Sequence, residues 1–176
     1  TIVEITPASV GFQYVGFKVI QLSDRETFTY QDPSHESCLT ILSGSVDAIL
    51  NGQEYKQLGS RASVFEPVSP TAIYLPPGQA LTLTGLNHVE VAISTAPAIG
   101  QYSARVILPE QMTRTVRGSG SNTRYVCDIL PETAEAESLL VVEVVTPSSN
   151  SSSYPPHKHD TASSTETFLE ETYYHM

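Results

Sequence analysis

The chain has 176 residues, of which 40% are hydrophobic and 16% are charged. This is the composition of a packed globular protein, long enough for one core or for one domain and part of another. The formal net charge of −10 disfavours binding to nucleic-acid phosphates and to anionic lipid, so we expect neither as a partner. No apolar run approaches the roughly 20 residues that span a membrane, and no membrane association is expected.

The two cysteines, Cys38 and Cys127, stand far apart without a Cys-x-x-Cys spacing. This pattern predicts two buried thiols rather than a disulfide. Residues 1–7 carry no basic stretch followed by an apolar block, so no signal peptide is visible. Together these features predict a cytoplasmic protein.

Short strand-like segments dominate the first hundred residues. β-Branched and aromatic residues mix with polar ones, and Gly, Pro and Asn separate the segments. Asn51-Gly52 is a strong hairpin signal because both residues accept positive φ. The strands are expected at 15–22, 26–30, 38–42, 45–50, 59–65, 72–75, 80–84 and 88–93, with turns at Ser43-Gly44 and Pro76-Pro77-Gly78. This rhythm, without a convincing helical period, predicts an all-β sandwich or barrel.

The character of the chain changes after residue 98, where arginines gather at positions 105, 114, 117 and 124. Two interpretations stay open: a solvated connection with internal ion pairs, or a segment that orders a domain or subunit contact or holds a carboxylate by bidentate pairing. Strands are expected at 126–130 and 139–145. Between them, the acidic segment 131–138 predicts a short helix or a linker, and residues 147–153 predict a flexible loop.

The segment 152–160 reads Ser-Ser-Tyr-Pro-Pro-His-Lys-His-Asp. His157 and His159 lie on one side of an extended chain, because side chains alternate along a strand. A glutamate from a neighbouring strand would complete a set of two His and one carboxylate, which suits a divalent transition metal. The alternative is an exposed His-Lys-His in a polar loop, without a ligand.

Residues 167–176 read as a further strand with aromatic and acidic residues. A strand that begins a new sheet has an unpaired edge, which favours self-association and a homo-oligomer. We therefore expect either that residues 139–176 join the first barrel, or that the sequence is a fragment of a longer protein.

The block at 152–160, followed by Leu169-Glu170-Glu171 and Tyr173-Tyr174, resembles the 5-deoxy-glucuronate isomerase (IolB) family, which is similar to 4-deoxy-5-ketouronate isomerases. The resemblance covers the whole chain, although the family has a Trp where this chain has Ser151. Further matching stretches are 15–17, 42–44, 61–65, 74–77, 96–98, 117–118 and 143–147.

The resemblance implies a bicupin, two jelly-roll barrels in tandem. Residues 1–135 would form an N-terminal cupin with a decayed metal site, and residues 136–176 an incomplete start of the catalytic cupin. In the first barrel, His35-Glu36 lacks the His-x-His pattern, and Pro76-Pro77-Gly78 resembles the second cupin motif without its histidine. His88 stands alone, and we expect a core or surface histidine there rather than a ligand.

The family's reaction is an aldose–ketose isomerisation of a small sugar acid, 5-deoxy-glucuronate, to 5-dehydro-2-deoxy-gluconate. The resemblance implies His157, His159 and Glu171 as ligands of a divalent Zn, Mn or Fe type ion, with at least one ligand missing from this chain. Glu171 and Lys158 are the implied catalytic residues, although Lys158 alternates to the opposite face from the two histidines. Glu166 and Glu170 are the other carboxylates considered, and Glu170 would face away from Glu171 in a regular strand.

Two other functions remain open. The same two-His-one-carboxylate set can hold Fe(II) and activate O₂, as in a cupin dioxygenase. A non-catalytic sugar-binding or assembly module is the third possibility, because the implied site is incomplete.

Overall fold

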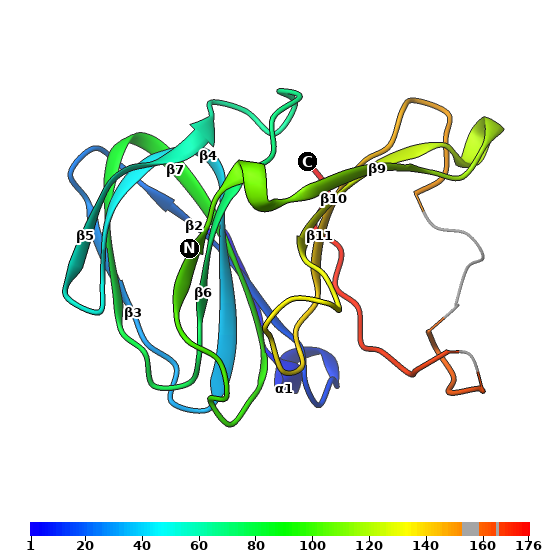
Figure 1. Ribbon diagram of the computed structural model, residues 1–176, viewed down its shortest axis with the longest axis horizontal. Coiled ribbons are helices and arrows are strands. Elements are labelled where there is room, and N and C mark those ends of the chain that lie inside the picture. Colours follow the sequence, from blue (N-terminus) through cyan, green and yellow to red (C-terminus); the bar gives the residue numbers. More distant parts are fainter. Residues whose placement is uncertain (153–158, 165) are drawn as a thin grey trace.

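A computed structural model describes residues 1–152, 159–164 and 166–176. It confirms the all-β prediction: within these residues the chain forms two antiparallel sheets, one short helix and two 3-10 turns (Figure 1). The elements are β1 (Val3–Ile5), α1 (Pro7–Val10), β2 (Gly16–Leu22), β3 (Thr27–Tyr30), β4 (His35–Leu50), β5 (Gln53–Arg61), β6 (Thr71–Leu75), β7 (Leu81–Pro97), β8 (Arg105–Ile107), η1 (Pro109–Gln111), β9 (Thr113–Arg117), η2 (Gly120–Asn122), β10 (Arg124–Leu130) and β11 (Val141–Val145). No helix within the described ranges has the length and hydropathy of a membrane span.

The larger sheet has eight strands in the order β1-β2-β7-β4-β6-β8, with β3 added to β7 and β5 added to β4. The two longest strands, β4 and β7, pair along almost their whole length and bend, so that they belong to both layers of one barrel (Figure 1). The resulting first barrel agrees with the jelly-roll expectation.

The predicted turn at Ser43-Gly44 is wrong, because β4 runs through it. The pairing of β4 with β7 shifts register between Ile41 and Ser45, and Gly44 has φ +78°. A Cβ at Gly44 would collide with the carbonyl oxygen of His88 on β7. The glycine therefore marks a bulge that bends one long strand between layers. Likewise, the segments predicted at 80–84 and 88–93 are two halves of the single strand β7.

The Asn51-Gly52 hairpin is confirmed, with φ of 54° and 76° at the two residues. The strand expected at 59–65 is wrong in position, because β5 occupies residues 53–61 and pairs with β4 directly after the turn. Leu58 is buried, whereas most of residues 53–57 are exposed. This edge strand therefore carries little of the apolar alternation by which strands are recognised.

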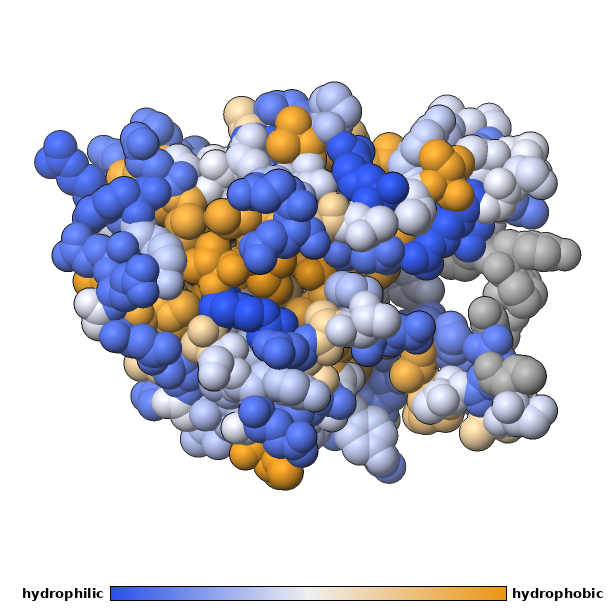
Figure 2. Space-filling view, viewed as in Figure 1, coloured by the Kyte–Doolittle hydropathy of each residue, from blue (hydrophilic) through white to orange (hydrophobic). Residues whose placement is uncertain are grey.

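Aliphatic side chains fill the interior of the first barrel. They come from β2, β4, β5, β6 and β7, and most are less than 4% exposed: Ile20, Leu22, Leu39, Ile41, Val46, Ala48, Leu50, Leu58, Ile73, Leu75, Leu81, Leu83, Val89, Val91 and Ile93. Burial of each larger side chain stabilises the fold by about 1.5–3 kcal/mol. On the face seen in Figure 2, most of the surface is hydrophilic, with an apolar area over this barrel.

The smaller sheet has the order β11-β10-β9. It confirms strands near 126–130 and 139–145, whereas residues 131–138 form turns and bends rather than a helix. The strand predicted at 167–176 is wrong, because residues 166–176 have no regular secondary structure. The domain boundary expected at residue 135 stays a prediction. The smaller sheet spans this position, because β9 and β10 lie before it in the sequence and β11 lies after it.

A second core lies between the first barrel and the smaller sheet. It includes Cys38 and Tyr74 from the barrel, and Cys127 and Leu130 from β10. Both cysteines are free and buried, as predicted. Burial raises the pKa of the Cys38 thiol to about 12 and also raises that of Cys127, so both stay protonated at neutral pH.

The β5–β6 loop of the barrel contacts one row of side chains across the smaller sheet. Arg114, Cys127 and Glu143 are register partners on β9, β10 and β11, so they share a face. Arg114 donates to the carbonyl of Pro67 at 2.5 Å, and Cys127 Sγ donates to Ser69 Oγ at 3.4 Å.

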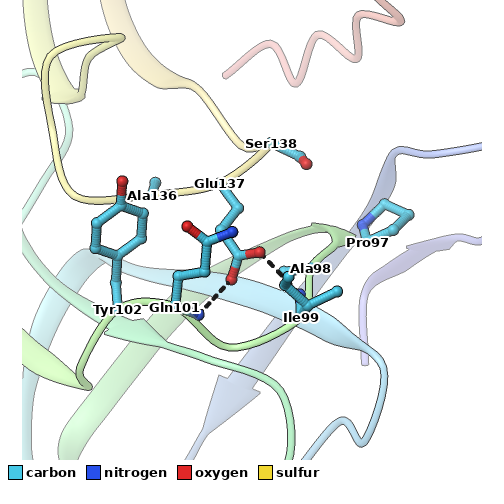
Figure 3. Close-up of a pocket in the computed structure, with 8 residues that line it drawn as sticks. All are labelled: Pro97, Ala98, Ile99, Gln101, Tyr102, Ala136, Glu137 and Ser138. Carbon is cyan, nitrogen blue, oxygen red and sulfur yellow. Dashed lines mark hydrogen bonds between the residues drawn. The ribbon is translucent and has the colours of Figure 1, made fainter.

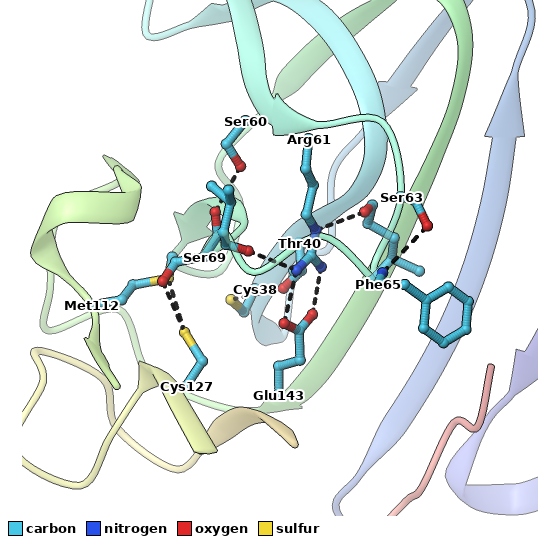
Figure 4. A network of polar contacts seen from close by, with 12 residues as sticks. Cys38, Thr40, Ser60, Arg61, Ser63, Phe65, Ser69, Met112, Cys127 and Glu143 are labelled. Carbon is cyan, nitrogen blue, oxygen red and sulfur yellow. Dashed lines mark hydrogen bonds and ion pairs between the residues drawn. The ribbon is translucent and has the colours of Figure 1, made fainter. Parts of the chain in front are cut away.

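Glu143 makes the third contact of this row, a bidentate ion pair with Arg61 at the end of β5 (Figure 4). Arg61 Nη1 donates to Glu143 Oε1 at 2.8 Å, and Nη2 donates to Oε2. The guanidinium also donates from Nε to Leu42 O at 3.0 Å and from Nη1 to Val68 O at 3.1 Å, and the Arg61 side chain is only 1% exposed.

The bidentate carboxylate pairing considered for residues 105–124 is thus made by an arginine outside that segment. Within the segment, Arg117 pairs with Asp128 at 2.9 Å, so internal ion pairing and a contact between sheets both occur.

We expect Glu143→Ala to lower the free energy of unfolding by about 3 kcal/mol, because it leaves the buried Arg61 charge unpaired. This is the lower end of the usual cost, since 22% of the Glu143 side chain is exposed. Urea denaturation measures the effect. The matched control is Glu54→Ala, which breaks an exposed ion pair with Lys56 and should cost less than about 1 kcal/mol. Equal losses in the two variants would contradict the expectation.

Candidate functional site

His159 is the member of the predicted histidine pair that the structure describes; His157 and Lys158 lie outside the described residues. The His159 side chain is half-buried, and its Nδ1 atom has no hydrogen-bond partner among the described residues. Glu166 Oε2 lies 3.5 Å from that nitrogen. The carboxylate beside His159 is therefore Glu166, which the sequence offered only as a weaker candidate.

A closed loop brings His159 and Glu166 together. Ser163 N–H donates to the carbonyl of Glu166 at 2.8 Å, and Glu166 N–H donates to Ser163 Oγ at 3.0 Å. The N–H of Leu169 then donates to the carbonyl of His159 at 3.0 Å. These local bonds, rather than the alternation of a strand, place the two side chains.

Glu170 and Glu171 point to different surroundings. The Glu170 carboxylate accepts the backbone N–H groups of residues 13, 14 and 15 at 2.7, 2.8 and 3.0 Å. Burial alone would raise the pKa of Glu170, but these three N–H groups outweigh it and lower that pKa. Glu171 is exposed, and it accepts a hydrogen bond from Tyr173 Oη at 2.7 Å.

The donors around His159 fit a divalent transition metal. An imidazole nitrogen without a hydrogen bond faces a carboxylate oxygen, and Zn, Mn and Fe ions take these two donor types. Within residues 1–152, 159–164 and 166–176, no three His, Cys, Asp or Glu side chains gather into a metal-binding group. Further ligands would therefore have to come from outside these ranges, where His157 lies.

The histidines of the first barrel have other surroundings. His35 Nδ1 lies 3.0 Å from Asp32 Oδ1, and Asp32 Oδ1 also accepts the N–H groups of Ser34 and His35 at 2.9 Å each. His88 is exposed on β7. Neither histidine belongs to the aliphatic interior of the first barrel, because His35 is only half-buried and His88 is exposed.

Glu36, which the sequence analysis named only as part of an incomplete cupin motif, is fully buried at the start of β4. Its carboxylate accepts the hydroxyl of Tyr74 at 2.7 Å and the N–H groups of residues 137, 138 and 139 at 2.9, 2.6 and 2.7 Å. Burial, together with the hydrogen bond to Glu36, raises the pKa of Tyr74. The Arg105 guanidinium lies over the Tyr74 ring, 4.4 Å from its centroid.

Glu137 is the second carboxylate that attaches the loop at residues 131–139 to the barrel. It also borders a cavity of about 430 Å³ (Figure 3). Its carboxylate accepts the N–H groups of Ile99, Gly100 and Gln101 at 2.8, 2.7 and 2.8 Å. Tyr102 and Ser138 also line the cavity. The acidic composition of residues 131–138 was a visible signal, but it did not reveal that one of these acids accepts three backbone N–H groups.

Comparison with known proteins decides the family. The model of the KduI/IolB family matches residues 1–176, which is the entire chain. This chain belongs to the KduI/IolB family. The resemblance drawn from residues 152–160 and 169–174 is thereby confirmed.

Two curated relatives of this KduI/IolB chain are each named 5-deoxy-glucuronate isomerase. The protein from Geobacillus kaustophilus is 44% identical over 99% of this chain, and the protein from Geobacillus thermodenitrificans is 41% identical over 99%. The chain spans 63% and 64% of their lengths, respectively, which is less than two thirds of each.

A solved structure of an IolB-like protein from Salmonella typhimurium LT2 is 38% identical and superposes with a TM-score of 0.90. The match covers 95% of this chain and 64% of that one. The Escherichia coli protein YlbA matches 74% of this chain and 49% of its own, with a TM-score of 0.53 and 14% identity, which shows a shared fold alone.

The three N–H groups of residues 99–101 lower the pKa of Glu137 below its ordinary value of 4.5, although burial partly opposes them. A depressed pKa adds stability at higher pH, and that stability is lost as the pH falls through the folded-state value. We expect the melting temperature to decrease as the pH falls below about 4.5. In Glu137→Gln this decrease should be smaller over the same pH range.

Thermal melts between pH 3 and 7 test this expectation, with Glu132→Gln as the control on the same loop, where the side chain is exposed. An unchanged pH slope in Glu137→Gln would contradict it.

Proposed function

We propose that the protein carrying this chain is a 5-deoxy-glucuronate isomerase. One observation carries the proposal: a relative of that name is 44% identical over 99% of this chain. Because the chain spans under two thirds of its relatives, the activity, the substrate and any partner belong to this proposal. We also propose a small sugar-acid substrate and a cytoplasmic location, which two free, buried thiols support.

The reaction moves a proton between adjacent carbons of a sugar acid through an enediol. His157 and His159, with Glu171 or Glu166 as the carboxylate, would hold a divalent ion, which supplies Lewis-acid polarisation of the sugar carbonyl when bound. His159 supports this role through its free Nδ1 atom and its neighbour Glu166.

The remaining roles follow from charge and exposure. Glu171 is exposed and hydrogen-bonded to Tyr173 Oη, so it can accept a proton from substrate and return it. The sugar carboxylate is repelled by a chain of net charge −10, so a local cation is needed to bind it. Lys158, adjacent to His159 in sequence, is the cation we propose for that role.

Replacement of His157 or His159 by Ala should abolish metal content and isomerase activity together. We expect metal affinity to fall by about 100-fold or more, because loss of residues that merely support the ligands already costs about 10–100-fold. Metal content is measured by elemental analysis, and conversion of 5-deoxy-glucuronate is followed by NMR. The control is His88→Ala, which removes an exposed histidine of the first barrel and should change neither quantity. Full activity without bound metal would contradict the proposal, and substrate-dependent oxygen consumption would indicate a dioxygenase instead.

The identity of the carboxylate ligand can be tested separately. If Glu166 is the ligand, as its position beside His159 favours, Glu166→Gln should weaken metal binding more than tenfold while Glu171→Gln retains it. Under that assignment, Glu171→Gln should instead lower kcat with the metal still bound, as expected for a base. Titration of both variants with Zn²⁺ measures the affinity, and the opposite order would assign the ligand to Glu171.

A further inference from the structure

The segment that follows the His159 loop has no regular secondary structure to hold it. Residues 169–176 lack a strand ladder, so their position depends on contacts with other elements. Those contacts lead to the opposite end of the sequence, to residues 13–19 and the barrel surface beside them.

The first contact is electrostatic. The Glu170 carboxylate takes three successive N–H groups between α1 and β2, from Gln13, Tyr14 and Val15. Hydrogen bonds to a charged acceptor are roughly twice as strong as neutral ones. Three of them on one carboxylate fix both its position and the direction of the chain that carries it.

The second contact is apolar. The Tyr174 ring lies 5.5 Å from the Phe17 ring, centroid to centroid, and is tilted by 39°. Tyr174 also packs against a buried cluster of Val19, Leu42 and Ala92 on the outside of the barrel. Such an aromatic pair stabilises the contact beyond the area that it buries.

The receiving surface is itself rigid. Phe17 belongs to β2, where it pairs with Ile5 on one side and Ser94 on the other. A Cβ at the neighbouring Gly16 would lie 2.5 Å from Thr95 Oγ1, so β2 packs closely against β7 at this point. Gly16 and Phe17 are therefore held in the barrel sheet independently of residues 169–176, and residues 13–15 directly precede them.

Residues 169–174 are hydrogen-bonded to the candidate site. Leu169 N–H donates to the carbonyl of His159, and Leu169 directly precedes Glu170. We propose that residues 13–17 are the positioning element of the His159–Glu166 pair, anchoring residues 169–174 and through them the loop that carries both side chains. This inference rests on the proposed function, because it assigns the anchor a role at the proposed metal site.

Phe17→Leu tests the inference, because it keeps an apolar side chain in β2 and leaves every candidate ligand in place. We expect the dissociation constant for Zn²⁺ to rise at least fivefold, and the amides of residues 169–174 to exchange hydrogen faster. Phe17→Tyr, which keeps the ring, should restore both values. The matched control is Phe28→Leu, since Phe28 is also a half-buried aromatic on a barrel strand, β3, where it stacks on Tyr30.

A loss of barrel stability alone would lower the melting temperature of both Leu variants without changing Zn²⁺ affinity. Unchanged affinity and unchanged exchange in Phe17→Leu would overturn the inference. If the wild-type chain shows no saturable Zn²⁺ binding, the proposed metal site fails and the metal role of the anchor is overturned with it. In that case, amide hydrogen exchange of residues 169–174 in Phe17→Leu still decides whether residues 13–17 hold residues 169–174 in place.

Discussion

The buried ion pair between Arg61 and Glu143 is the constraint on which the arrangement of the two sheets depends. A guanidinium that is 1% exposed needs acceptors within the protein, and two barrel carbonyls together with one carboxylate of β11 accept four hydrogen bonds from it. Because Glu143 shares a face with Arg114 and Cys127, satisfying Arg61 also brings the rest of that row onto the β5–β6 loop. The geometry of one charged group thus orients the smaller sheet against the barrel.

Three other carboxylates attach irregular segments by a common chemical device. Glu36, Glu137 and Glu170 each accept three consecutive backbone N–H groups, and each joins parts of the chain that are far apart in sequence. A turn or a loop leaves its N–H groups without ladder partners, and burial makes that costly. An acidic chain can therefore use its surplus carboxylates to order loops, and here two of them attach residues 131–139 to the barrel.

The position of the candidate site depends on two parts of the chain that are far apart in sequence. The strand β11 leads toward the histidine segment, while residues 13–17 hold the segment that follows it. The first barrel has an interior filled with aliphatic side chains, and its contribution to the site is made on its outer surface. It acts as a scaffold on which the later part of the chain is positioned.

By itself, the sequence determined the all-β class, the Asn51-Gly52 hairpin, the buried thiols, most strands and the family, because these depend on alternation, on turn chemistry and on a distinctive motif. Only the tertiary structure decided that β4 runs unbroken through the bulge at Gly44, that residues 81–97 form the single strand β7, and that residues 166–176 are not a strand. It also placed Glu166, rather than Glu171, beside His159. The physical reason is that a bulge, a bidentate ion pair and a carboxylate on three N–H groups each join residues that are distant in sequence. Local patterns report which groups need partners, and the fold decides which partners they find.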